Sequence, residues 1–231
     1  MGVFKLLGDA RRLALIVSLP DNTVELALAA IEGGADGVKV HLNVEHRASG
    51  TRFGSFAQER PRLEAIVEAI GNKAALGIMP GAEAVASLEE LDQLKGMGFE
   101  FVDCYAHHFP AHYLGHGGMK KVLALGPTYV LDEVKGLASL GVDALEASIV
   151  EPEGYCQPLS ASDLARYRAL VGFSRLPVLV PTQRRISPAD IPLLAWAGVT
   201  GILIGAVVTG KEPDGVRKTT AAFRDSISRF T

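Results

Sequence analysis

Four ionisable residues occupy apolar segments that are typical of buried strands. Lys39 and His41 alternate with valines in GVKVHL, Glu146 lies in DALEASI, and Asp103 lies near the end of FEFVDC. Side chains alternate between the two faces of a strand, and the apolar face must pack against helices. The four ionisable side chains are therefore predicted to face one common chamber, where burial can tune lysine and carboxylate pKa values for general acid–base catalysis. Alternatively, Lys39 and Glu146 form only a structural ion pair, because a buried charge is costly unless it is paired.

The segments around these residues alternate between strand-like and helix-like patterns along the whole chain of 231 residues. Short apolar runs predict strands over 13–18, 37–42, 74–79, 99–104, 120–125, 143–149, 177–180 and 201–204. Capping residues and amphipathic stretches predict helices over 24–31, 61–70, 87–96, 129–140, 160–171, 188–197 and 216–229, with a short helix in the irregular connection 106–118. Eight such units predict a single (β/α)₈ TIM barrel domain spanning 1–231, with an open doubly wound sheet as the alternative. In such a barrel, the active site lies at the C-terminal ends of the strands.

The connection after the second strand, 43–60, is predicted to be a long polar loop of 18 residues. Connections of this type usually have about 2–6 residues, and long ones often serve as lids or binding loops. His46, Arg47 and Arg52 in this loop could bind an anionic group of a substrate. A solvated loop or a contact between subunits is the alternative.

The connection after the fourth strand is rich in histidine, with His107, His108, His112 and His116. Histidine is a common metal ligand, but the spacing matches no zinc-site pattern, and neither HExxH nor CxxC is present. We therefore expect no metal and no other cofactor.

The last two strand ends have the features of a phosphate site. Many barrels hold phosphate with the loops after strands seven and eight and a short helix N-terminus, where small residues let backbone N–H groups approach the oxygens. The residues predicted to surround the phosphate are Thr182, Gln183, Arg184, Arg185, Gly205 and Ala206. A strand end with small residues and no ligand is the alternative.

Segments in the first, seventh and eighth units resemble a known family. IGAVVTGKEP (204–213), RISP (185–188), LIVS (15–18) and LAAIEGGA (28–35) are similar to ribulose-phosphate-binding barrels. Among these barrels, the N-acylmannosamine-6-phosphate 2-epimerases are the most similar. The resemblance implies a (β/α)₈ barrel that binds a small phosphorylated molecule.

Two positions depart from that family's pattern. The epimerases carry a lysine at the end of strand three and a glutamate at the end of strand seven, where this chain has Pro80 and Thr182. The general acid–base pair of the family is therefore missing. Lys39 and Glu146 could supply the same residue types from other strands, but we expect no efficient epimerisation of N-acylmannosamine 6-phosphate.

Composition excludes several other classes. A net charge of −3 provides no excess of basic residues for a nucleic-acid backbone, and two cysteines cannot form a disulfide scaffold. The apolar run 13–19 is too short to span a bilayer, and no cleavage pattern follows it. We expect a cytoplasmic protein without membrane or nucleic-acid partners, which could form a homodimer.

These patterns together predict an enzyme that acts on a phosphorylated sugar or similar metabolite, as an isomerase, epimerase or carbon–carbon lyase. Lys39 and Glu146 would transfer protons, while His41 and Asp103 polarise a hydroxyl or carbonyl group. A non-catalytic barrel that binds a phosphorylated ligand is the first alternative. A metal-dependent lyase, which would need at least three convergent ligands, is the second.

Overall fold

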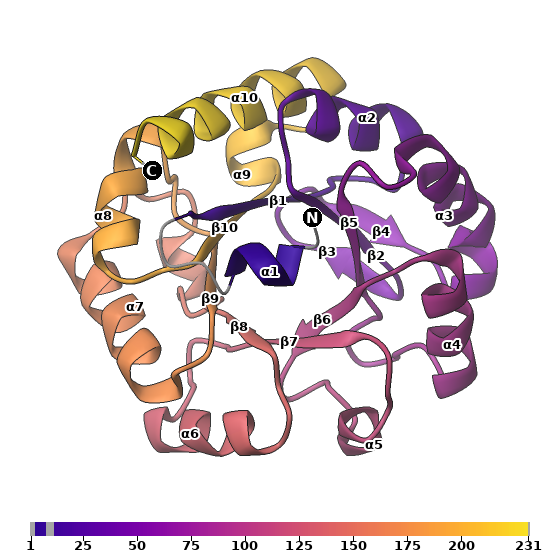
Figure 1. The fold of residues 1–231 in the computed structure, drawn as a ribbon, viewed down its shortest axis with the longest axis horizontal. Helices are drawn as coiled ribbons and strands as arrows, with labels where there is room; N and C mark the ends of the chain where they lie inside the picture. The colour runs from indigo at the N-terminus through magenta and orange to yellow at the C-terminus, as the bar shows by residue number, and fades with distance from the viewer. Residues whose placement is uncertain (1–2, 8–11, 231) are drawn as a thin grey trace.

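A computed structural model describes residues 3–7 and 12–230, which form a closed barrel of eight parallel strands surrounded by helices (Figure 1). The barrel strands in chain order are β1 (Ala14–Ser18), β2 (Gly37–His41), β5 (Ala75–Met79), β6 (Phe101–Tyr105), β7 (Lys120–Ala124), β8 (Ala144–Glu146), β9 (Val178–Pro181) and β10 (Gly201–Ile204). β1 pairs with both β2 and β10, which closes the barrel. This arrangement confirms the predicted (β/α)₈ fold.

The helices cover the outside of the barrel, where they bury the apolar face of each strand. They are α2 (Val24–Glu32), α3 (Phe56–Ile70), α4 (Leu88–Met97), α5 (Ala111–Leu114), α6 (Leu131–Ser139), α7 (Ala161–Ser174), α8 (Ile191–Trp196), α9 (Ala206–Thr209) and α10 (Pro213–Phe230), with 3₁₀ turns η1 (Pro152–Gly154) and η2 (Pro188–Asp190). Ser87 and Ser160 cap α4 and α7 through capping boxes, as serine at a helix start favours. No helix in these described ranges is both long and apolar enough to cross a membrane.

The connection predicted as a polar loop over 43–60 is instead largely structured. β3 (Val44–His46) and β4 (Thr51–Phe53) form an antiparallel hairpin, because Val44 pairs with Phe53 and the Phe53 ring is buried. The next helix starts at Phe56 rather than at Pro61. Ser55 and Gln58 form a capping box there, and this local bonding outweighs the preference of proline for the first turn.

A short helix that the sequence patterns did not predict, α1 (Val3–Leu7), lies across the N-terminal end of the barrel (Figure 1). Val3 and Leu7 are buried in the cluster that fills the barrel interior, and the rings of Phe4 and Phe101 are 5.7 Å apart. Phe101 itself fits inside because Gly77 has no side chain: a Cβ there would lie 2.0 Å from the Phe101 ring. These residues form an apolar floor beneath the polar part of the barrel.

Candidate active site

Lys39, Asp103 and Glu146 meet inside the barrel, above the apolar floor. They come from β2, β6 and β8 and are at most 5% exposed. The ammonium nitrogen Nζ of Lys39 donates to Asp103 Oδ2 at 2.8 Å and to Glu146 Oε2 at 2.7 Å. The structure thus brings three of the four predicted catalytic residues into one cluster; their catalytic role stays a prediction.

Lys39, Asp103 and Glu146 shift one another's pKa values. Burial alone would lower the pKa of Lys39, but the adjacent Asp103 and Glu146 carboxyl groups outweigh it and raise that pKa. Burial and the nearby Glu146 charge raise the pKa of Asp103 well above its usual value. Burial opposes ionisation of Glu146, yet Lys39 and the hydrogen bonds it receives lower its pKa to about 2. Burial and these neighbours therefore favour the ammonium form of Lys39, the carboxylate form of Glu146 and the protonated form of Asp103.

Two hydrogen-bonding positions of this cluster remain open to a ligand. Asp103 Oδ1 is buried and has no hydrogen-bond partner among the described residues. An ammonium group has three donors, and the two carboxyl groups are the only acceptors found for Lys39 Nζ in the described part of the chain. A buried unpaired oxygen is costly, which is expected where a ligand supplies the missing partner.

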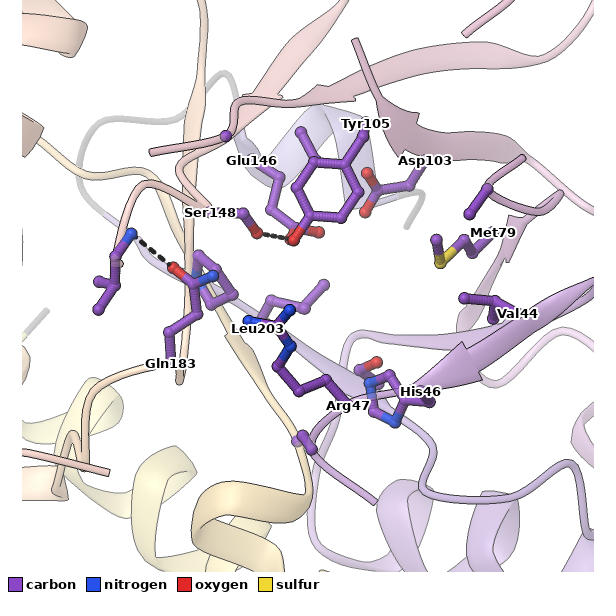
Figure 2. Close-up of a pocket in the computed structure, with 18 of the residues that line it drawn as sticks. Val44, His46, Arg47, Met79, Asp103, Tyr105, Glu146, Ser148, Gln183 and Leu203 are labelled. Atoms are coloured by element: carbon purple, nitrogen blue, oxygen red, sulfur yellow. Dashed lines mark hydrogen bonds between the residues drawn. The ribbon is translucent and has the colours of Figure 1, made fainter. Parts of the chain in front are cut away.

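Tyr105 and Ser148 also line the cavity beside this cluster, and sequence reasoning did not select either of them. Figure 2 shows both side chains next to Glu146, and the Ser148 hydroxyl donates a hydrogen bond to Glu146 Oε1. Tyr105 follows Asp103 by two residues, and Ser148 follows Glu146 by two. The alternation of side chains along a strand, applied one step further, would have predicted both.

His41, the fourth predicted catalytic residue, lies in the cavity wall but makes no hydrogen bond to the Lys39 cluster among the described contacts. Its Nε2 atom lies 3.1 Å from the Ser18 hydroxyl, and its ring packs between His46, at 4.7 Å, and Phe53, at 4.8 Å. Burial, together with neighbouring positive charge, lowers the pKa of His41 well below its ordinary value and that of His46 to about 4. Both imidazoles are therefore neutral at pH 7.

The cavity above the cluster has a volume of about 490 Å³ and opens at the C-terminal ends of the strands. Lys39 and Arg47 are the only lysine or arginine among its described lining residues. Arg47, from the hairpin connection, lies 5.7 Å above the Tyr155 ring and has no ion pair in the described structure. Arg52, on the neighbouring strand of the hairpin, is exposed and does not line the cavity.

Most residues of the predicted phosphate site bond to the protein itself. Gly205 N–H donates to the Thr182 hydroxyl at 3.0 Å, and Gln183 links the Val150 N–H to the Tyr155 hydroxyl. Arg184 pairs with Asp163 at 3.0 Å and donates to the Gly154 carbonyl. Arg185 is exposed outside the cavity.

The backbone N–H groups of Ala206 and Val207 differ from these, because no acceptor for either is found among the described residues. Both residues start the short helix α9. They line one groove at the cavity mouth together with Arg47 and Tyr155. The N–H groups without a described acceptor at this end of the barrel therefore belong to the two residues that follow Gly205.

The histidine-rich connection does not gather its side chains at one point. His107 and His108 line the cavity with ring centres 4.2 Å apart, whereas His116 binds Asp92 on the outside at 3.0 Å. The described residues include no group of three His, Cys, Asp or Glu side chains placed to hold a metal ion.

No protein-family model matches the chain, and neither does any curated protein. Solved structures do match over nearly the whole chain. A Mycobacterium tuberculosis tryptophan synthase structure has a TM-score of 0.76 at 17% identity, covering 97% of this chain and 96% of that one. Thiamine phosphate pyrophosphorylase from Pyrococcus furiosus has a TM-score of 0.68 at 18% identity, with 96% and 99% covered.

Phosphoribosyl anthranilate isomerase from Thermus thermophilus is similar as well, with a TM-score of 0.66 at 15% identity, covering 95% of this chain and 100% of that one. At identities this low, the similarity concerns the course of the backbone and says nothing about the side chains of the site. The chain therefore has the (β/α)₈ barrel fold of these enzymes.

Proposed function

We propose that this protein is an enzyme that transfers a proton within a small phosphorylated metabolite, in an isomerase or epimerase type of reaction. The observation that supports this most strongly is the buried Lys39–Asp103–Glu146 cluster, in which Asp103 has a raised pKa and one oxygen without a partner among the described residues. Two neighbouring carboxyl groups whose pKa values are pushed apart are typical of acid–base sites. The raised pKa of Asp103 favours its protonated form, and the lowered pKa of Glu146 favours its anion.

The state of Lys39 favours proton transfer over Schiff-base chemistry. A lysine that attacks a carbonyl must first lose its proton, and enzymes achieve this by lowering its pKa. Here the pKa of Lys39 is raised, because two carboxyl groups face its ammonium group. A lyase that forms a covalent bond through this lysine is therefore disfavoured.

In the proposed reaction, the free N–H of Lys39 binds a carbonyl or hydroxyl oxygen of the substrate. The ammonium charge stabilises the negative charge that develops on this oxygen when the adjacent carbon loses a proton. Asp103 gives its proton to this oxygen and, as the resulting carboxylate, takes up the proton that the adjacent carbon releases, which leaves an enol. Return of a proton from Asp103 to carbon completes the reaction. Glu146 balances the charge of Lys39 throughout.

The phosphate group of the substrate would lie at the mouth of the cavity. Arg47, which has no ion pair among the described residues, supplies a positive charge there, and Ala206 and Val207 supply two N–H donors without a described acceptor in the same groove. The names of two similar structures, thiamine phosphate pyrophosphorylase and phosphoribosyl anthranilate isomerase, include a phosphorylated compound. This fits the resemblance of the 204–213 segment to phosphate-binding barrels.

A non-catalytic barrel that binds a phosphorylated ligand is the second candidate. Pro80 and Thr182 occupy the positions where the resembled epimerases carry their acid–base pair, and the Thr182 hydroxyl is occupied by Gly205 N–H. Such a protein would bind the same ligands without moving their protons.

Solvent-proton exchange separates the two candidates without knowledge of the product. The protein is incubated in D₂O with a panel of aldose and ketose phosphates, and mass spectrometry detects deuterium bound to carbon. The proposed enzyme labels at least one of them, and Asp103→Asn abolishes the labelling. Asp92→Asn, at an exposed aspartate outside the cavity, serves as the control and keeps the activity. Tight binding of a sugar phosphate with no labelling of any compound would support the binding protein instead.

A further inference from the structure

We infer that the substrate carries a free hydroxyl group between its phosphate and its reacting carbon, and that Ser18, oriented by His41, recognises this hydroxyl. Ser18 is then a residue that determines specificity, and His41 is a positioning residue that acts through it. The inference rests on the proposed function for the reacting carbon, but recognition of the hydroxyl can be measured as binding, without any turnover.

Ser18 lies between the two parts of the proposed site. It ends β1, whose neighbours in the barrel are β2 and β10. Ser18 pairs in register with Lys39 of β2, so their Cα atoms are about 5 Å apart. On the other side, a Cβ atom built on Gly205 would lie 3.6 Å from Ser18 Cβ. A ligand that reaches from the groove after Gly205 to Lys39 therefore passes the Ser18 hydroxyl.

The Ser18 hydroxyl has unused capacity for hydrogen bonds. Its only hydrogen bond to the described residues is with His41 Nε2, at 3.1 Å. A hydroxyl group has one donor and two acceptor positions, so two positions remain. Ser18 is only 4% exposed, yet it lines the cavity. A buried polar group with unused positions is expected where a ligand occupies them.

His41 is held in place through both its backbone and its ring. The Asn22 side chain donates to the His41 carbonyl oxygen at 2.8 Å and accepts from the His41 N–H at 3.2 Å. The imidazole ring packs between those of His46 and Phe53, whose centres are 4.7 Å and 4.8 Å away. A partner held this firmly fixes the direction in which the Ser18 hydroxyl meets a ligand.

The hydrogen bond between Ser18 and His41 can run in either direction. A neutral imidazole has hydrogen on one ring nitrogen and accepts at the other. His41 Nδ1 is buried without a hydrogen-bond partner among the described residues, so no contact there selects one tautomer. With hydrogen on Nε2, the Ser18 hydroxyl can donate to a ligand. With hydrogen on Nδ1, Ser18 donates to His41 and accepts from the ligand.

A hydroxyl group is the ligand group that suits this pair best. It both donates and accepts, so it matches either tautomer, whereas a phosphate or carbonyl oxygen only accepts and matches one. A phosphate also finds its countercharge at Arg47, at the cavity mouth. Since no described carboxyl group bonds to His41 Nδ1, Ser18 lacks the supported base of a serine nucleophile. The substrate class is therefore a phosphate ester with hydroxyl groups along its carbon chain.

Binding of unreactive phosphate esters tests this inference. Pentitol 5-phosphates carry hydroxyl groups along the chain, and 5-hydroxypentyl phosphate has the same length without the internal ones. Calorimetric titration of the whole protein measures the affinity for ribitol, arabitol and xylitol 5-phosphate and for the alkyl ester. Ser18→Ala should weaken binding of at least one pentitol phosphate by about 2-fold to 10-fold, the range for one neutral hydrogen bond. It should not weaken binding of the alkyl ester.

Two further variants make the test specific. His41→Phe keeps an aromatic ring between His46 and Phe53 but removes Nε2, so it should also weaken pentitol phosphate binding more than alkyl ester binding. Ser139→Ala is the matched control, because Ser139 is exposed on α6 and does not line the cavity. Circular dichroism and thermal melting verify that each variant is folded, and His41→Phe tests the inference even if Ser18→Ala fails to fold.

Three results would overturn the inference: no binding of any pentitol phosphate, equal losses for both kinds of ester in the folded variants, or no loss for either. The outcome is separable from the proposed function, because pentitol phosphates have no carbonyl group beside which a proton could be removed. The expected loss without deuterium labelling of any sugar phosphate would assign hydroxyl recognition to a binding protein. Labelling without the expected loss would support the enzyme and exclude the role of Ser18.

Discussion

The ammonium nitrogen of Lys39 lies 2.7 Å from Oε2 of Glu146, although 107 residues separate the two in the chain. Closure of the barrel makes this contact possible, because β2 and β8 approach each other only across its interior. Both side chains are only 7% exposed, so the contact is largely shielded from bulk solvent. Loss of either partner leaves a charge with little solvent to stabilise it.

Replacement of Lys39 should therefore destabilise the fold. Lys39→Met leaves Glu146 and Asp103 without their shared cation, and removal of one partner of a buried ion pair typically costs about 3–5 kcal/mol. Lys120→Met provides the control, because the Lys120–Asp143 pair is exposed and such pairs contribute at most about 1 kcal/mol. Urea unfolding at neutral pH measures both. A Lys39→Met protein as stable as the control would show that the cluster is not held by its ion pairs.

Asp103 should make stability depend on pH in a direction opposite to that of an ordinary ion-paired carboxylate. Its pKa is raised in the folded state, so between its ordinary value of 3.8 and the raised value the folded protein holds a proton that the unfolded chain releases. The contribution of Asp103 to stability therefore falls as pH rises through this window. The asparagine side chain in Asp103→Asn is neutral at every pH, so this variant does not lose that stability as pH rises.

The measurement is the free energy of unfolding of both proteins at about pH 4.5 and about pH 7.5. The variant should gain stability relative to wild type at the higher pH. His41 and His46 are present in both proteins, so the acid destabilisation expected from their lowered pKa values cancels in the difference. A difference that is constant with pH, or that falls, would mean that Asp103 is ionised.

Arg47 should account for much of the affinity for inorganic phosphate. A hydrogen bond to a charged group contributes about 1.5–3 kcal/mol, so Arg47→Gln should weaken binding by about 10-fold to 100-fold. Arg52→Gln removes the same charge from the opposite strand of the hairpin, outside the cavity, and should change binding little. Calorimetric titration with phosphate compares them. Equal losses in the two variants would indicate attraction by overall charge alone.

Gly77 should be essential for packing of the barrel interior. A methyl group in Gly77→Ala would overlap the Phe101 ring, and overpacking of a core costs about 1–3 kcal/mol. Gly136→Ala, in the exposed part of α6, meets no atom within 4 Å and should stabilise the protein by about 0.5–1 kcal/mol. Thermal melting should shift the two variants in opposite directions. A neutral Gly77→Ala would show that α1 and Phe101 yield easily.

The protein should not epimerise N-acylmannosamine 6-phosphate efficiently. Loss of a general acid–base group removes about 10²–10⁴-fold of the rate, and here both family positions lack one. Pro80 has no titratable group, and the Thr182 hydroxyl already accepts from Gly205 N–H at 3.0 Å. Proton NMR of the sugar phosphate with purified protein should show no epimer over hours. Rapid formation of the epimer would mean that Lys39 and Asp103 replace the missing pair.

Much of the barrel could be predicted from local pattern, because each strand had to be apolar on the face that meets the helices. The strand over 201–204 agrees with β10, and the alternation in β2 correctly placed Lys39 inward. The hairpin over Val44–Phe53 was missed, since it depends on burial of Phe53, whose ring stacks on His41 at the end of β2. α1 was missed for a similar reason: five residues form a stable helix there only because the barrel interior accepts Val3 and Leu7.

The position of a site residue could be predicted where the alternation along one strand determined it. It could not be predicted where contacts with residues from other units determined it. Arg184 and Arg47 are equally basic in the sequence, yet only Arg184 meets an aspartate, Asp163, from another unit. Arg47 and Arg52 are five residues apart, and the hairpin directs only Arg47 over the cavity. Which cation remains available to a ligand is thus a property of tertiary pairing.

The apolar floor of the barrel also limits where a ligand can enter and leave the cavity. In the described part of the chain, α1 and Phe101 fill the N-terminal end, so a ligand is expected to enter and leave at the cavity mouth beside Arg47 and Tyr155. A molecule that leaves through this mouth then prevents another from entering at the same time. For the proposed enzyme, product is therefore expected to inhibit by competing with substrate for this site.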